Sequence, residues 1–406
     1  MPTDADLAST GSERPARAVP GAPQHLIGRL PFLGVVIASL GGPLALAAVY
    51  VPSIVADVAG SAGLVTVAGS AAFAVPLLVW LRFARHVAGA GGLYDYVVAG
   101  GGRRLALAQA GLWIASYLLY LVYTTTAIVY DTLPAVLPWI RTYQPALEVA
   151  IPVVLAGVML AGRTATLATL GALAGGQLIV LAALAVVSAG HGGSSDAFSL
   201  PAGSPGVARA SGQVALLYVC GSLPVFLGGE VRRPARTIRR GLVGGYLLTA
   251  AAVTATVYPL AANPAFTRAP IPGAAVAQVF SGRALAVAVG VGVAASTAGV
   301  MLVEFLALSR LVHAITARPV RHIVAALAVV LVASAPLTLI DPERIYIDLL
   351  RPSMAALWLS QLIVFVVYPR FAARVGRLRL TDLGLTVGAS AFALYGLYST
   401  FQSSST

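Results

Sequence analysis

Long apolar runs, separated by short segments that carry arginine, dominate the chain. A helix needs about 20 apolar residues to cross the hydrocarbon core of a bilayer. Eleven runs without a charged residue approach or exceed this length: 31–56, 58–81, 105–130, 149–162, 164–190, 210–229, 241–267, 284–303, 323–340, 352–369 and 383–406. The fourth run is short, and we expect its helix to begin nearer Tyr143. The pattern predicts an all-α polytopic membrane protein with about 11 transmembrane helices.

The composition points to the same class. Of the 406 residues, 58% are hydrophobic and 10% are charged, whereas a soluble domain carries about 25% charged residues. The single cysteine, Cys220, excludes an internal disulfide and a cysteine-based metal site. The five histidines lack metal-ligand spacing, and acids do not cluster at the ends of the apolar runs as a membrane enzyme would require. We therefore expect no enzymatic activity, no metal and no cofactor, with the lipid bilayer as the main partner.

The basic residues indicate an orientation. All 26 are arginine, and a cytoplasmic N-terminus places 20 of them on the cytoplasmic side and 6 outside. This asymmetry follows the positive-inside rule. The net charge of +12 then records topology, and we expect no nucleic-acid partner. The sequence predicts a multi-pass protein of the cell membrane with a disordered cytoplasmic tail over residues 1–27 and a C-terminus outside.

Two predicted helices contain a Gly/Pro interruption. Residues 39–43 read Ser-Leu-Gly-Gly-Pro in the first, and residues 220–224 read Cys-Gly-Ser-Leu-Pro in the sixth. Each alone is also typical of a kink or a packing contact. Together they occupy matching places in two sets of five helices, the pattern of inverted-repeat transporters with a midplane substrate site. The sequence predicts a 5+5 inverted repeat with discontinuous helices 1 and 6: residues 28–190, then 191–369, with an additional C-terminal helix over 370–406.

Two loops add a family resemblance. Residues 88–97 read Ala-Gly-Ala-Gly-Gly-Leu-Tyr-Asp-Tyr-Val, and residues 229–238 read Gly-Glu-Val-Arg-Arg-Pro-Ala-Arg-Thr-Ile. With the Gly-Gly break they resemble the amino acid–polyamine–organocation (APC) superfamily, which carries similar stretches between helices 2 and 3 and after helix 6. The resemblance covers roughly residues 28–260. It implies a leucine-transporter-type fold of five plus five inverted helices, with amino acids or related amines as substrates.

The resemblance also implies a substrate site at the two interruptions. The backbone of the first break would receive a carboxylate, and carbonyls of the second would receive an amino group. The implied residues are Ser39, Leu40, Gly41 and Gly42 in the first break, and Val219, Cys220 and Gly221 in the second. Tyr120, at mid-depth in the third helix, would gate the pocket, or would serve in packing or interfacial anchoring. Since no carboxylate stands near either break in the sequence, we expect polyamines to be excluded.

The coupling chemistry departs from the family pattern. Gln177 stands where many proton-coupled members carry lysine, and an amide does not titrate. Ser296 and Thr297 would either join a sodium site or hydrogen-bond between helices. Charged groups inside the membrane are site candidates by default, so Glu304 is expected to pair with Arg310 as a structural or gating pair, or to carry a proton.

These observations favour a secondary active transporter, a permease that moves amino acids or related small zwitterions by alternating access. Its partners would be the small-molecule substrate and a coupling ion or counter-substrate. The alternative is a transport-inactive sensor or partner subunit that retains the permease fold. Two departures motivate that alternative: the absent lysine and a helix count of 11, where the family usually has 12.

Overall fold

The computed structural model describes residues 32–40, 42–191, 195–199, 205–260, 264–376 and 378–402. The predicted N-terminal tail (residues 1–27) and Gly41 lie outside these ranges. Within them the chain is helical and contains no β-strand, which agrees with the predicted all-α class.

Eleven membrane-crossing segments account for the described chain. The first is interrupted and consists of α1 (Phe32–Ser39), α2 (Pro43–Ala45), a π-helical turn η2 (Leu46–Tyr50) and α3 (Val51–Val55). Ten further segments are long and apolar enough to span a bilayer. They are built on α4 (Ala62–Ala84), α6 (Arg103–Thr126), α8 (Gln144–Leu160), α9 (Arg163–His191), α10 (Pro205–Leu216) with η7 (Leu217–Glu230), α11 (Pro234–Leu260), α14 (Arg283–Thr316), α15 (Val320–Thr338), α16 (Pro342–Val375) and α17 (Leu380–Gln402). Ten of the predicted spans are thus long and apolar enough to cross a bilayer, and the interrupted first span agrees with the eleventh.

Short helical elements connect these spans. They are η3 (Ala56–Ser61), α5 (Leu93–Gly101), η4 (Ala127–Thr132), α7 (Leu133–Val136), η5 (Pro138–Tyr143), η6 (Ser195–Phe198), α12 (Pro264–Thr267) and α13 (Pro272–Phe280). The fourth span begins at Gln144, directly after η5, so its predicted start near Tyr143 is confirmed.

The eighth span extends beyond its charge-free run, 284–303. Helix α14 continues for 13 more residues to Thr316, and Glu304, which the sequence also places inside this span, is fully buried. A charge marks a helix end only when the side chain must reach water. Here tertiary packing covers the carboxyl group, so the helix has no reason to stop.

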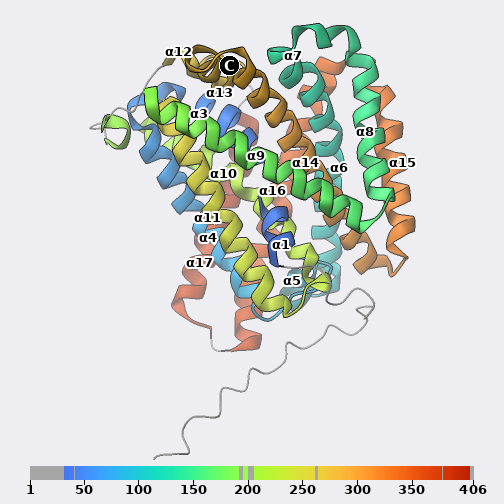
Figure 1. Ribbon diagram of the computed structural model, residues 1–406. Coiled ribbons are helices and arrows are strands. Elements are labelled where there is room, and N and C mark those ends of the chain that lie inside the picture. The colour runs from blue at the N-terminus through green and yellow to red at the C-terminus, as the bar shows by residue number, and fades with distance from the viewer. Residues whose placement is uncertain are drawn as a thin grey trace, which may run out of the picture.

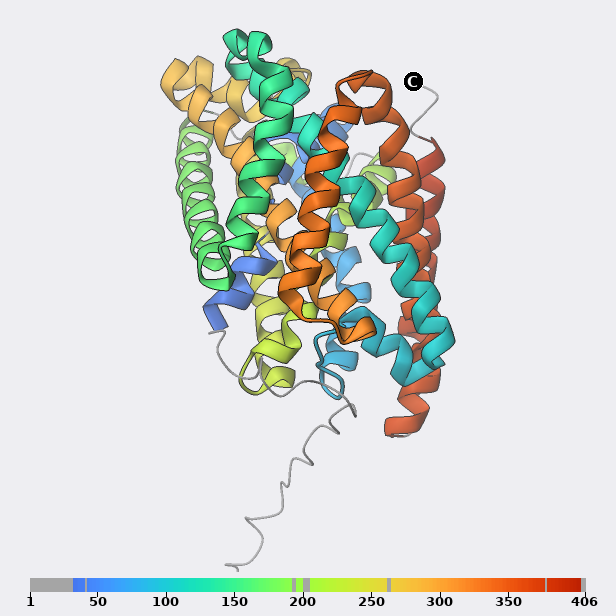
Figure 2. The same cartoon turned by 90° about the vertical axis from the view of Figure 1, so that its right-hand side faces the viewer.

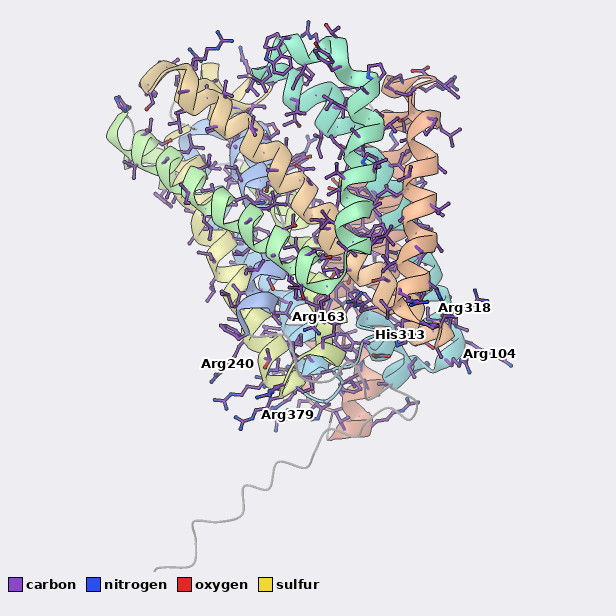
Figure 3. The ribbon with its side chains drawn as sticks, turned by 45° about the vertical axis from the view of Figure 1, so that its right-hand side comes forward. Arg104, Arg163, Arg240, His313, Arg318 and Arg379 are labelled. Atoms are coloured by element: carbon purple, nitrogen blue, oxygen red, sulfur yellow. The ribbon has the colours of Figure 1, made fainter. Side chains whose placement is uncertain are left out.

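The spans form one bundle with two distinct ends (Figures 1 and 2). Figure 3 shows Arg104, Arg163, Arg240, Arg318 and Arg379 gathered at one end, which we call the arginine-rich end. Helix α5 lies there, whereas α7, α12 and α13 lie at the opposite end, where α17 finishes (Figure 1). The spatial segregation of arginine matches the asymmetry predicted from the sequence.

The last helix is tied to the bundle by a polar contact. Helix α17 packs on α16 and α4. Asp382, near its start, accepts a hydrogen bond of 2.8 Å from Tyr368 Oη of α16 and forms an ion pair with Arg82 of α4. The segment after the tenth span is thus an integral part of the bundle.

Candidate functional site

The break in the first span exposes backbone amides at a helix start. Helix α1 ends at Ser39, and the chain resumes helical structure at Pro43 after Gly42, whose φ of +77° is disfavoured for a residue with a Cβ. The Leu46 N–H donates to Gly42 O at 3.0 Å. Amides before Leu46 belong to the first turn, where the α-helical ladder provides no partner and the helix dipole favours negative charge.

The break in the sixth span has a different form. Helix α10 tightens into the 3₁₀ segment η7, which runs for 14 residues and contains Pro224. Runs of 3₁₀ helix beyond three or four residues are uncommon and mark strain or a hinge. Val219, Cys220 and Gly221 lie in its first turns, and Val219 O accepts a hydrogen bond of 3.2 Å from Ser222 Oγ.

Helix α14 packs on both interrupted spans, and one of its faces lies against the first break. A Cβ at Gly292 would lie 2.6 Å from Leu44 Cδ2, and a Cβ at Gly42 would lie 3.0 Å from Val300 Cγ2. Residues spaced by four share a helix face, so Ser296 lies between these contacts and Glu304 one turn beyond them.

Two polar side chains on this face are buried without partners. Ser296 and Glu304 are both 0% exposed. Within the described part of the chain, neither Ser296 Oγ nor either carboxyl oxygen of Glu304 has a hydrogen-bond partner. Most buried polar atoms in proteins are paired, so this face of α14 is unusually rich in unsatisfied polar groups.

Tyrosines of α6 complete the surroundings of Glu304. Helix α14, which carries Glu304, packs on α6, which carries Tyr117 and Tyr120, and on η7, which contains Cys220. Tyr117 is buried and packs on Trp113, with ring centroids 4.1 Å apart. Tyr120 is only partly buried and lies 5.6 Å from Tyr123, centroid to centroid. The structure therefore packs together the three elements that carry Tyr120, Cys220 and Glu304, residues that sequence reasoning proposed separately.

The predicted coupling residues divide into two groups. Gln177 is buried on α9 and faces α14: a Cβ at Gly299 would lie 3.4 Å from its Nε2. Thr297 Oγ1 instead donates to Val293 O of its own helix at 2.9 Å. Ser296 and Gln177 thus face the interior of the bundle, while the hydroxyl of Thr297 is satisfied locally.

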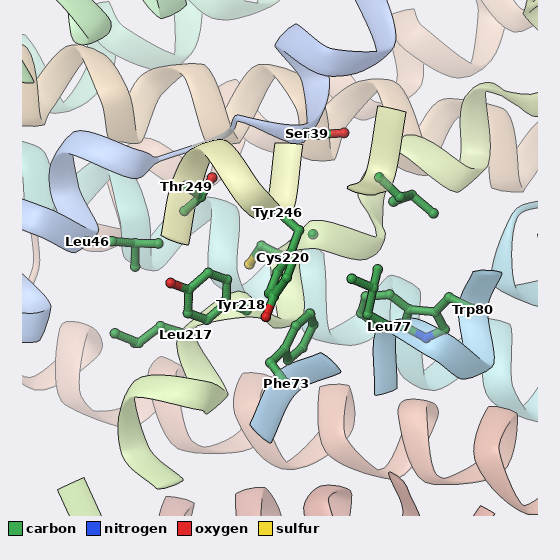
Figure 4. Close-up of a pocket in the computed structure, with 12 residues that line it drawn as sticks. Ser39, Leu46, Phe73, Leu77, Trp80, Leu217, Tyr218, Cys220, Tyr246 and Thr249 are labelled. Atoms are coloured by element: carbon green, nitrogen blue, oxygen red, sulfur yellow. The ribbon is translucent and has the colours of Figure 1, made fainter. Parts of the chain in front are cut away.

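A small cavity lies beside the two breaks, between spans one, two, six and seven (Figure 4). Ser39, Cys220 and Gly221 line it, and its volume is about 30 Å³. That volume admits one or two water molecules, whereas ligand pockets measure about 300–1,000 Å³. The cavity beside the breaks is therefore too small for a substrate in this structure.

Sequence reasoning missed an anchor of the sixth span. Tyr218 Oη and Ser70 Oγ of α4 are 2.9 Å apart, and Tyr246 Oη of α11 donates to Ser70 O. Tyr218 also stacks on Phe73, with centroids 5.5 Å apart. Figure 4 shows Tyr218, Tyr246 and Phe73 together beside Cys220. The available signal was the position of Tyr218, two residues before the interruption.

The predicted pairing of Glu304 with Arg310 is wrong. Arg310 Nε donates to Glu230 Oε1 at 2.6 Å, and Arg163 Nε lies 3.3 Å from Glu230 Oε2. Residues six apart on one helix are separated by about 9 Å along its axis and by about 120° around it, so Glu304 and Arg310 point to different surroundings. Arg310 belongs to a buried ion cluster (Arg163, Glu230, Arg310) that joins α9, η7 and α14 at the arginine-rich end.

The two loops that carry the family resemblance contact each other. A Cβ at Gly229 would lie 3.1 Å from Ala90 Cβ. Just before this segment, a Cβ at Gly228 would lie 2.6 Å from Gly89 O, and a Cβ at Gly92, where φ is +56°, would lie 2.5 Å from Phe226 Cδ1. Such approaches admit only glycine. The glycine-rich loop before α5 is therefore packed directly on the end of η7.

This loop also encloses a carboxyl group outside the membrane-spanning segments. Asp95 lies in the first turn of α5, and its Oδ2 accepts a hydrogen bond of 3.0 Å from the Gly91 N–H. Burial raises the pKa of Asp95 from 3.8 to about 6, against the opposing effect of that hydrogen bond.

Asp95 predicts a pH dependence of stability. A carboxyl group whose pKa is higher in the folded than in the unfolded state destabilises the fold as pH rises from about 4 to about 6. Asp95→Asn is therefore expected to raise the melting temperature relative to wild type at pH 8, with a smaller difference at pH 5. The exposed Asp348→Asn variant serves as the control and should show no such trend. A melting temperature of Asp95→Asn below wild type at pH 8 would contradict the prediction.

Comparison with known proteins identifies the fold. No family model matches the chain, and no curated protein sequence matches it significantly. Among solved structures, 139 chains match. One is MhsT in complex with L-phenylalanine, with a TM-score of 0.60 and 14% sequence identity, over 91% of this chain and 98% of that chain. The chain thus has the leucine-transporter-type fold, in a polytopic all-α membrane protein.

Proposed function

We propose that the protein is a secondary active transporter of amino acids or related small amines, which works by alternating access in the cell membrane. One observation carries the proposal: two interrupted spans both pack on α14, which contains buried polar side chains without hydrogen-bond partners. Irregular backbone at membrane depth is tolerated only against protein or a water-filled cavity. The likeness to MhsT, solved with L-phenylalanine, supports an amino acid as the substrate.

The same proposal assigns roles to the predicted residues. The first break, including Gly41, would hold the substrate carboxylate, and the carbonyls of Val219, Cys220 and Gly221 would hold its amino group. Tyr120 would close the pocket. Gln177 and Ser296 face the interior and are better placed to contact a coupling ion or counter-substrate than Thr297, whose hydroxyl is engaged by its own helix.

Family membership and orientation belong to the proposal as well. The contact between the 88–97 loop and the end of η7 supports membership of the APC superfamily, because the two segments that resemble it form one structural unit. The arginine-rich end would face the cytoplasm, with the C-terminus outside. Residues 28–190 and 191–369 would be the two inverted repeats.

Uptake by proteoliposomes tests the proposal. The purified protein is expected to exchange or accumulate radiolabelled L-phenylalanine, or another member of an amino acid panel, across the vesicle membrane. Binding without flux in a folded preparation would overturn it in favour of a sensor or partner subunit. Absence of both binding and flux across the panel would overturn it outright.

A variant of the first break ties uptake to this site. Gly42→Ala should abolish uptake, because its Cβ would meet Val300 and its φ of +77° costs an alanine about 1–2 kcal/mol. Gly102→Ala is the matched control: its φ is +87°, but a Cβ there meets nothing within 4 Å. Equal uptake by the two variants would show that the conformation of the first break is not required for transport.

A further inference from the structure

We propose that Glu304 is the cation-binding group of the transport site, holding a proton where no counter-charge stands beside it and exchanging it for the ammonium group of a substrate. The inference rests on the proposed function and adds the coupling chemistry. It also revises the expectation that no carboxylate lies near either break, which considered only neighbours in the sequence.

The position of Glu304 is the first argument. It lies one turn beyond Val300, the residue of α14 that touches Gly42 in the first break. The helix that carries Glu304 also packs on η7, which contains the second break, and on α6, which carries Tyr117 and Tyr120. Glu304 therefore lies on a helix that contacts both interrupted spans and the helix of the tyrosine proposed to close the pocket.

The second argument is that the buried carboxyl group of Glu304 has no ion-pair or hydrogen-bond partner. Three other carboxyl side chains of the described residues are buried, and each has a partner. Glu230 has Arg163 and Arg310, Asp382 has Arg82 and Tyr368, and Glu148 Oε1 accepts hydrogen bonds of 2.8 and 2.7 Å from Thr126 and Thr338. Glu304 has none.

The described surroundings of Glu304 provide no positive charge. The titratable groups that face Glu304 are Cys220 on η7 and Tyr117 and Tyr120 on α6, while the described residues place no cation beside it. The nearest arginine in sequence, Arg310, is held by Glu230.

Charge balance then determines what the site takes. An ionised carboxylate buried without a partner is strongly unfavourable, so Glu304 is neutral wherever no counter-charge stands beside it. A ligand can supply the missing counter-charge. Neutral Glu304 and an incoming ammonium group give a carboxylate–ammonium pair and one released proton, with no other reactant required.

An ammonium group suits the remaining surroundings. It offers three N–H donors and no acceptor. One donor would meet the carboxylate of Glu304, and the others would meet carbonyls in the first turns of η7. The chemistry is shared by amino acids and by amines without a carboxylate, so the inference defines the recognised group as a primary ammonium.

Proton release on binding tests the inference. The full-length protein in weakly buffered detergent solution is titrated with L-phenylalanine and with phenethylamine, while a pH-sensitive dye reports released protons. About one proton per bound ligand is expected, with apparent affinity rising by up to tenfold per pH unit. Proton release with both probes would show that the ammonium group is sufficient for recognition. Proton release with L-phenylalanine alone would show that the carboxylate of the ligand is also required.

Matched variants decide whether Glu304 is responsible. Glu304→Gln should remove proton release and the pH dependence of affinity, and Glu304→Asp should retain both with weaker binding. Glu148→Gln, at the hydrogen-bonded buried carboxyl group, should leave them as in wild type. If Glu304→Gln does not fold, loss of release in Glu304→Asp with equal ligand occupancy would overturn the inference.

The inference and the function it rests on fail in different ways. Transport by wild type without proton movement, or proton release retained in Glu304→Gln, would overturn the role of Glu304 alone. Failure of wild type to bind or transport either probe would overturn both for these ligands.

Discussion

Glu230→Gln is expected to lower the free energy of unfolding by about 3–5 kcal/mol, the range for breaking a buried ion pair by removing one partner. Glu230 is 2% exposed and interacts with both Arg163 and Arg310. Its loss would leave Arg310, itself 5% exposed, without a counter-charge. Thermal or SDS-induced unfolding in detergent, followed by circular dichroism, measures the change.

The matched control is Asp348→Asn. It makes the same change from carboxylate to amide, but in the exposed i,i+4 pair with Arg344, where N and O are 3.4 Å apart. Exposed pairs contribute about 0–1 kcal/mol, so this variant should resemble wild type. Similar losses for the two variants would show that the cluster is not structurally important. A large loss for Glu230→Gln alone would show that it holds spans five, six and eight together at the arginine-rich end.

Gly245→Ala is expected to destabilise the protein by about 1–3 kcal/mol, as overpacking does, and to reduce uptake. A Cβ at Gly245 would lie 2.2 Å from Ser39 Cβ. Neither atom belongs to a flexible side-chain end, so α1 would have to move away from α11. Because Ser39 is the last residue of α1 and lines the cavity beside the breaks, that movement would displace the first break.

Its control is the preceding glycine. A Cβ at Gly244 meets only Val36 Cγ2, at 3.9 Å. Gly244→Ala should therefore be neutral or should stabilise the helix by up to about 1 kcal/mol. Melting temperatures and uptake rates of both variants provide the measurement. An unchanged Gly245→Ala would mean that the close packing of α1 on α11 does not position the break.

Several parts of the site were accessible from residue types alone. Two Gly/Pro pairs predict the interruptions, because glycine permits positive φ and proline lacks an N–H. They are Gly42 with Pro43, and Gly221 with Pro224. Gln177 was singled out through a family resemblance, at the position where many proton-coupled members carry lysine, and the structure has it facing Gly299. These inferences hold because they depend on local backbone chemistry or on an aligned position.

The surroundings of charged side chains were not accessible in this way. The sequence suggested that Glu304 and Arg310 pair, since they are near neighbours on one apolar helix. The structure instead pairs Arg310 with Glu230, 80 residues away, and leaves the buried carboxyl group of Glu304 without a hydrogen-bond partner. It likewise buries Glu148 between threonines of α6 and α15, which no local pattern indicated.

The sequence by itself therefore determined that the protein lies in a lipid bilayer. It also determined the 11 spans, the segregation of arginine and the two interruptions. Each of these follows from properties of single residues or of short runs, because the bilayer imposes its requirement on every segment separately. Only the tertiary structure decided which buried charges are compensated, and which helix face meets the breaks. Pairing depends on distances between spans far apart in the chain, and those distances are set by packing of the whole bundle.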